Sequence, residues 1–240
     1  MSSPARRCLP AAALVVILAL ATLLSPLATA TTKPAGQSGA VLMTNLKSRG
    51  DNEIDRRLQV LSTLANVVDE SRHLSASDKS QLKDQIQSDQ SGLSALKAKI
   101  DADTDLPTLR VDLRKIVTDF RVFVLLIPKI HMVRAIDLFQ DAAGFLEKAT
   151  TKLQSLIDTA KGQGKDTAAD QTAFDDMLAK ISDAKAKLQG LAAELLSLAP
   201  SGYPGNRSAS MAAREKIRQA KTDLTEARAD ARKILGDLRP

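Results

Sequence analysis

The sequence predicts an all-α fold, specifically an elongated antiparallel helical bundle or coiled coil. Three observations support this prediction. Apolar residues recur at spacings of three and four along most of the chain, which is the period of a helix. Ala, Leu, Asp, Lys and Gln dominate the composition, as they do in long helices. Only 2% of the 240 residues are aromatic, whereas sheet proteins and most α/β enzymes fill their cores with aromatic and β-branched residues.

The first thirty residues predict an export signal. Arg6 and Arg7 precede an uncharged apolar run from Leu9 to Leu24, and the small residues Ala28 and Ala30 fit the pattern of a cleavage site. We therefore expect cleavage after Ala30 and a secreted, periplasmic or otherwise extracytoplasmic protein. The alternative is an N-terminal membrane anchor that stays uncleaved, because about 20 apolar residues suffice to span a bilayer.

Residues 31–40 are small, polar and rich in Gly and Pro, which predicts a flexible linker. The only cysteine, Cys8, lies in the segment that we expect to be removed, so the mature chain would have no thiol for a disulfide, a metal site or catalysis. Removal of Arg6 and Arg7 also lowers the formal charge from +6 to +4. Because the remaining charges are interleaved, we expect an ordinary surface and no nucleic-acid binding.

Three helices are predicted before residue 131. The first spans about 45–72, and Ser75 is a good N-cap for the second, with Asp78 in the capping-box position. Asp105 is the expected cap of the third helix, and Pro107 fits its first turn, where a missing N–H costs nothing. Their apolar stripes are Ile54, Leu58, Leu61, Ala65 and Val68; Leu82, Ile86, Leu93, Leu96 and Ile100; and Leu109, Leu113, Ile116, Phe120, Phe123, Ile127 and Ile130.

The third stripe continues past Pro128 to Ala160, where the glycines at 162 and 164 are expected to end the helix. Proline inside a helix removes a hydrogen bond, so we expect a bend there. Two more stripes follow, over 174–198 and 217–238, and the intervening short loops require antiparallel neighbours. The resulting layout has two three-helix units, residues 41–127 and 128–240, which share one long helix bent near Pro128.

An acidic cluster between the second and third helices is a candidate calcium site. Asp101, Asp103, Asp105 and Asp112 occupy positions 1, 3, 5 and 12 of an EF-hand spacing, and carboxylate oxygens are the ligands that Ca²⁺ prefers. Leu106 stands where the loop requires glycine, which argues against a calcium loop. The competing interpretation is helix capping and loop solubility. No other cofactor is expected.

The most apolar stretch after the N-terminal run is Phe120–Phe139. Its interspersed charges keep it from qualifying as a membrane span, so we expect a core junction where the two units meet. The alternative is an exposed patch for a partner or a membrane surface. The candidate partner-binding residues are Phe120, Phe123, Ile127, Ile130 and Met132.

Catalytic motifs are not apparent, and we do not expect an enzyme. His73 and His131 lie on different predicted helices, and the chain has no Gly-x-Ser-x-Gly elbow, phosphate-binding loop or dinucleotide fingerprint. Two tripeptides match known recognition motifs. One has a simpler structural explanation, and the use of the other depends on the host organism. Residues 49–51 spell the integrin tripeptide Arg-Gly-Asp, in which Asp51 is better explained as a helix cap, and residues 206–208 match a glycosylation sequon.

The block from Ile100 to His131 resembles a pattern found in uncharacterised exported bacterial proteins that are helical and coiled-coil-like. This resemblance implies export and helical structure, with no known activity. We therefore expect an exported, non-enzymatic structural or protein-interaction protein of the cell envelope or extracellular space, with a protein partner. Its heptad seams can also pair between chains, which would allow homo-oligomers. Membrane contact is expected only through an uncleaved signal segment.

Two alternative functions follow from the same sequence features. One is an extracytoplasmic chaperone-like or ligand-binding module that uses the apolar junction at residues 120–139. The other is a calcium-dependent envelope protein that uses the acidic cluster. An open groove at the junction would favour binding, and a closed junction would favour a spacer.

Overall fold

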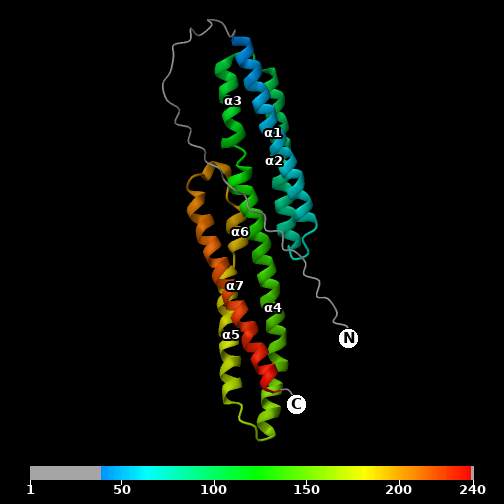
Figure 1. The fold of residues 1–240 in the computed structure, drawn as a ribbon, viewed down its shortest axis with the longest axis vertical. Helices are drawn as coiled ribbons and strands as arrows, with labels where there is room; N and C mark the ends of the chain where they lie inside the picture. The colour runs from blue at the N-terminus through cyan, green and yellow to red at the C-terminus, as the bar shows by residue number, and fades with distance from the viewer. Residues whose placement is uncertain (1–38, 239–240) are drawn as a thin grey trace, which may run out of the picture. The chain divides into compact units, whose positions relative to one another are not determined.

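The computed structural model describes residues 39–238, which belong to one compact unit spanning 37–240. This part of the chain is built from helices and contains no strand, which confirms the predicted all-α bundle (Figure 1). The predicted signal peptide, and all but the last two residues of the predicted linker, lie outside the described residues. No helix between residues 39 and 238 has both the length and the hydropathy that a bilayer-crossing segment needs.

Helices α1 (Gly39–Asp69), α2 (Ala76–Ala102) and α3 (Leu106–Thr118) pack against one another. The two predicted caps are confirmed. Ser75 Oγ accepts a hydrogen bond from the Asp78 N–H at 3.0 Å, and Asp105 Oδ1 accepts one from the Thr108 N–H at 2.8 Å. The apolar stripes are buried as predicted, because residues such as Ile54, Leu61, Leu82, Leu93, Ile100, Leu109 and Ile116 form the core between these helices.

The long helix bends before Pro128. Helix α3 ends at Thr118, residues 119–121 are not helical, and the π-helix η1 (Val122–Leu126) leads directly into α4 (Ile127–Gly162). In η1 the N–H groups of Leu126 and Ile127 donate to carbonyls five residues earlier, those of Arg121 and Val122. Pro128 therefore lies in the first turn of α4, where it has no regular helical bond to break.

Helix α4 packs with α5 (Ala168–Leu188) and α7 (Asn206–Asp237), and α5 and α7 lie along each other (Figure 1). The predicted glycine stop after α4 is confirmed. Gly164 has a positive φ of 80°, the Gly164 N–H bonds to the Lys161 carbonyl, and the Lys165 N–H bonds to the Ala160 carbonyl. This pair of bonds is the Schellman arrangement, which satisfies carbonyls at the helix end.

The helix predicted to reach Leu198 is interrupted. Helix α5 ends at Leu188, and Gly190, with a φ of 71°, begins the short helix α6 (Leu191–Leu196). The 3₁₀ turn η2 (Pro200–Gly202) then leads to α7. The apolar spacing continues through the break, since Leu188, Leu191 and Leu195 are all buried, so periodicity alone could not reveal it.

We expect the small residues of α7 to set how closely it approaches α4 and α5. Ala227 is fully buried at this contact, whereas Ala229 on the same helix is exposed. Ala227→Leu should lower the free energy of unfolding by about 1–3 kcal/mol, because extra methylenes in a packed core force side chains and backbone apart. Ala229→Leu is the matched control and should change it by less than about 0.5 kcal/mol in urea titrations. Similar values for the two variants would contradict the packing described here.

Candidate functional site

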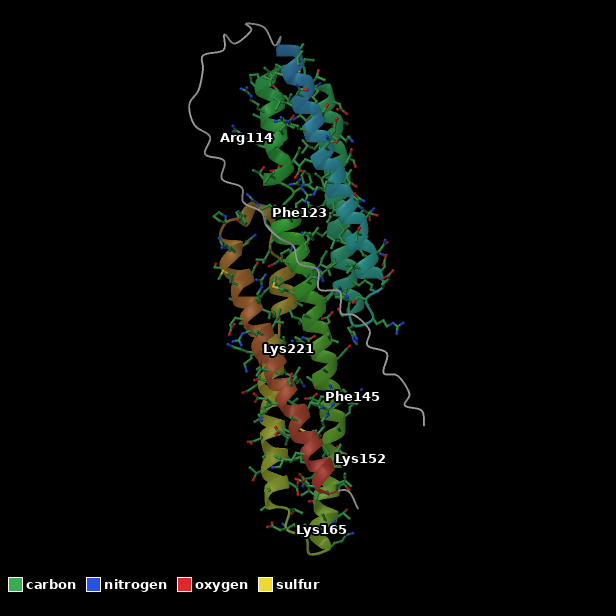
Figure 2. All side chains as sticks on the ribbon, viewed as in Figure 1. Arg114, Phe123, Phe145, Lys152, Lys165 and Lys221 are labelled. Carbon is green, nitrogen blue, oxygen red and sulfur yellow. The ribbon has the colours of Figure 1, made fainter. Side chains whose placement is uncertain are left out.

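The residues predicted to bind a partner lie at the junction of α3 and α4, but they face the protein interior to different degrees. Ile130 and Met132 are buried, and Phe120, Phe123 and Ile127 are half-buried. The Phe120 ring fills the space next to Gly92 of α2, where an added Cβ would come within 2.7 Å of the ring. In α1, the guanidinium groups of Arg56 and Arg57 lie 5.0 and 5.1 Å from the ring centre of Phe123, which Figure 2 labels at the junction.

A fully buried lysine, Lys129, connects three segments of the junction by hydrogen bonds. Lys129 Nζ donates to Gln85 Oε1 of α2 at 3.0 Å and to the carbonyls of Leu196 and Leu198 at 3.4 and 2.7 Å. It therefore links α4 to α2 and to the end of α6. Burial lowers the pKa of Lys129 to about 8. In the sequence, Lys129 is one of the charges that interrupt the apolar run Phe120–Phe139, and no local pattern indicates that it is buried.

A polar cleft of about 570 Å³ lies beside this lysine. Gln85 and Leu196, which both bond to Lys129, line the cleft, together with the carboxylates of Asp84, Asp89 and Asp119. Burial raises the pKa of Asp89 to about 6, although the positive charge of Lys129 opposes the shift. The carboxylates thus gather on one side of the junction.

A second cleft opens at the junction, lined by different residues, and we name it the α7 cleft. It has a volume of about 470 Å³ and is bounded by η1, the start of α4, and the start of α7. Val124 and Met211 remain 57% and 62% exposed at this cleft. Its lining residues are Val124, Leu125, Pro128, Tyr203, Asn206, Arg207, Ser210, Met211 and Arg214, which include two arginines and no carboxylate.

Tyr203 forms a fixed wall of the α7 cleft. The Arg121 guanidinium lies 4.1 Å from the centre of the Tyr203 ring, and Arg121 Nε donates to the Pro200 carbonyl at 3.3 Å. Asn206, the acceptor residue of the glycosylation sequon, donates its side-chain amide to the Ala199 carbonyl. These contacts hold the connection between α6 and α7 next to η1.

The four aspartates of the candidate calcium site have separate structural roles. Asp112 is buried and forms ion pairs with Lys115 at 2.7 Å and Lys99 at 3.1 Å. The hydrogen bond from Lys115 lowers the pKa of Asp112, and that from Lys99 adds to the effect, although burial opposes them. Asp105 caps α3 through the Thr108 N–H, and this bond lowers the pKa of Asp105.

The remaining two aspartates lie at the end of α2. Asp101 is exposed and its carbonyl accepts a hydrogen bond from Lys47, whereas Asp103 is buried directly after the last residue of the helix. Across residues 39–238, no three or more His, Cys, Asp or Glu side chains are grouped so that they could hold a metal ion. The spacing of an EF-hand loop is therefore present in the sequence, but the structure does not bring the four carboxylates together.

Other sequence motifs fall on structural positions. Asp51 lies inside α1, so the prediction that it caps the first helix is wrong, because the helix begins twelve residues earlier at Gly39. Gly50 is buried where an added Cβ would come within 2.5 Å of Leu113. The two histidines are exposed on the surface, and His73 Nδ1 lies 2.9 Å from Asp141 Oδ2.

A third cleft, of about 640 Å³, follows the groove between α4 and α5. Leu178 lines it, and the ion pair between Glu147 and Lys185 spans it at 2.6 Å. Phe145, labelled on α4 in Figure 2, is 74% exposed and is not among the lining residues. The groove therefore combines a bridging ion pair with scattered apolar residues, a mixture that is ordinary on a protein surface.

Removal of the Lys129 ammonium should destabilise the junction. Lys129→Ala leaves the carbonyls of Leu196 and Leu198 without their donor and opens a cavity, so the free energy of unfolding should fall by about 2–4 kcal/mol. Lys152→Ala, on an exposed part of the same helix, is the control and should change it by less than about 0.5 kcal/mol. Urea unfolding measures both, and equal losses would show that the three hydrogen bonds contribute nothing.

Asp89 should make stability depend on pH. Its pKa is raised in the folded state from 3.8 to about 6, so the folded protein holds this proton more tightly than the unfolded chain does. The stabilisation that comes from this tighter proton binding is complete below about pH 4 and is lost as the pH rises through 6. Asp89→Asn should remove it, so the stability of the wild type relative to the variant should fall between pH 4 and 6 and then level off. A pH-independent difference would contradict the shift.

The junction thus holds two features that could serve a function, a buried lysine that fixes its walls and an open apolar cleft with a cationic rim. A concave site with an apolar lining and a few polar groups is suited to noncovalent binding. No family model matches the chain, and neither does any curated protein or solved structure.

Proposed function

We propose that this protein is an exported, non-enzymatic binding module whose binding site is the α7 cleft. The observation that carries the proposal is the open cleft itself, because apolar side chains from η1, α4 and α7 converge there and two of them, Val124 and Met211, remain exposed. A junction closed on all sides would suit a spacer, whereas a concave apolar groove suits the binding of a partner or ligand.

The dimensions and fixed walls of the α7 cleft support this proposal. Its volume of about 470 Å³ lies within the usual range of small-molecule sites, about 300–1,000 Å³. Leu125 is buried beneath it, and Arg121 holds Tyr203 in place by stacking on its ring. Walls that are already ordered reduce the entropy lost when a ligand binds.

The remaining parts of the proposal rest on other observations. Export is inferred from the sequence of residues 1–30 alone, which lie outside the described part of the chain. The calcium-dependent alternative has less support, because Asp112 is already paired with two lysines and Asp105 is used as a helix cap. The α7 cleft is better supported as a binding site, because it is an open space that no side chain of the described structure fills.

The α7 cleft should bind an uncharged apolar dye such as Nile red. Titration of the chain should give a saturable, blue-shifted emission. The double variant Val124→Ser/Met211→Ser should bind about thirtyfold more weakly, because each of the two lost side chains removes about 1 kcal/mol of apolar burial. Val111→Ser removes an equally exposed valine from α3, outside the cleft, and should leave the affinity within about twofold. Equal affinities for the wild type and the double variant would contradict the proposed function.

A further inference from the structure

We infer that the α7 cleft selects an anionic amphiphile, that is, a single acyl chain ending in a carboxylate or phosphate. The chain would lie along Val124, Leu125, Pro128 and Met211, and the head group would lie by the guanidinium groups of Arg207 and Arg214. This inference rests on the proposed function and adds to it the charge and shape of the ligand.

The charge of the cleft is uncompensated. Arg207 and Arg214 lie two turns apart on α7 and both line the cleft. Among residues 39–238, neither of them forms an ion pair within 4.0 Å, whereas Arg218 on the same helix pairs with Glu215. Guanidinium groups bind carboxylates and phosphates in a bidentate manner, so these two are available for an anionic head group.

The surrounding helix increases the positive potential at the cleft. The first half of α7, residues 206–221, carries five cationic side chains, at positions 207, 214, 216, 218 and 221, against the single acid Glu215. The carboxylates of the junction, Asp84, Asp89 and Asp119, line the other cleft beside Lys129. Separation of the two signs favours anions at the α7 cleft and disfavours cations.

The apolar part of the cleft suits a flexible chain. Met211 is unbranched and 62% exposed, so it can adjust to acyl chains of different length. Val124 and Pro128 border the groove from η1 and the first turn of α4, and Leu125 closes its floor. An acyl chain laid in this groove would remove the exposed surfaces of Val124 and Met211 from water, and this burial supplies the apolar share of the binding energy.

The protein carries its own reporter for this site. Tyr203 is the only tyrosine in the sequence, which has no tryptophan, and its ring lines the α7 cleft. Arg121 stacks on that ring at 4.1 Å. A ligand bound in the cleft should therefore change the emission and anisotropy of the whole protein's tyrosine signal, whereas binding elsewhere on the described surface should not.

The test is a titration of the full chain followed by Tyr203 fluorescence. Dodecanoate and dodecyl phosphate are compared with dodecyl maltoside and dodecyltrimethylammonium, each below its critical micelle concentration. We expect a saturable signal for the two anions, with affinity at least tenfold higher than for the uncharged or cationic amphiphile, and weaker binding at high salt. Arg207→Gln/Arg214→Gln should abolish this preference and still bind Nile red as the wild type does.

Arg228→Gln is the matched control, because Arg228 is exposed in the second half of α7 and does not line the cleft. It should keep the preference for anions. Equal binding of all four amphiphiles, or a preference that survives in the Arg207/Arg214 double variant, would overturn the inference while the dye result leaves the proposed function standing. If the wild type binds neither the dye nor the amphiphiles, both the proposed function and this inference are overturned.

Vesicles distinguish the two sources of the ligand. Binding of free dodecanoate without flotation on phosphatidylglycerol vesicles would assign a soluble anion. Flotation that depends on Arg207 and Arg214 would assign a lipid taken from a bilayer. Both outcomes support an anionic amphiphile, and flotation equal on phosphatidylcholine and phosphatidylglycerol vesicles would contradict it.

Discussion

The hydrogen bonds of the buried Lys129 ammonium are the interaction on which the rest of the junction depends. One side chain of α4 reaches an amide of α2 and two carbonyls at the end of α6, segments that are 44 to 69 residues away in the sequence. The carbonyl of Leu198 lies only a few residues before Pro200 and Tyr203. The position at which the chain leaves α6 therefore follows from Lys129, and with it the position of Tyr203 at the α7 cleft.

The irregular backbone before α4 decides which side chains of the junction face solvent. Residues 119–121 leave the helix, and the wide turns of η1 follow, so that Val122, Leu125 and Leu126 are buried while Val124 is exposed. π-Helical turns are uncommon and often lie at functional sites. In this protein, η1 ends at Leu126, so Pro128 falls in the first turn of α4, where its missing N–H breaks no helical hydrogen bond. The same backbone irregularity that accommodates the proline thus places an exposed valine beside α7.

Local signals made much of the fold predictable, while the site depends on contacts that no local signal records. Ser75, Asp105 and Gly164 act through neighbours within a few residues, and each was readable as a cap or stop. Pro128 indicated the bend of the long helix, but the apolar spacing did not indicate that the bend starts after Thr118 or that α5 ends before Gly190, because apolar residues continue through both places. The burial of Lys129 could not be predicted, because lysine side chains are usually exposed. The α7 cleft could not be predicted either, because its lining residues come from segments that are far apart in the sequence, from η1 to α7.

A lysine in this position needs an explanation, because burial of its charge is costly and an apolar side chain of similar length would avoid that cost. Burial depresses the pKa of Lys129 for the same reason. An apolar side chain could not supply directional hydrogen bonds. Only a donor such as the Lys129 ammonium can hold the carbonyls of Leu196 and Leu198 at defined distances. If the α7 cleft binds a ligand, accurate placement of Tyr203 relative to η1 matters more than the last few kcal/mol of stability. The retained charge is then best understood as the means by which a bundle of ordinary apolar stripes keeps one open site in a defined shape.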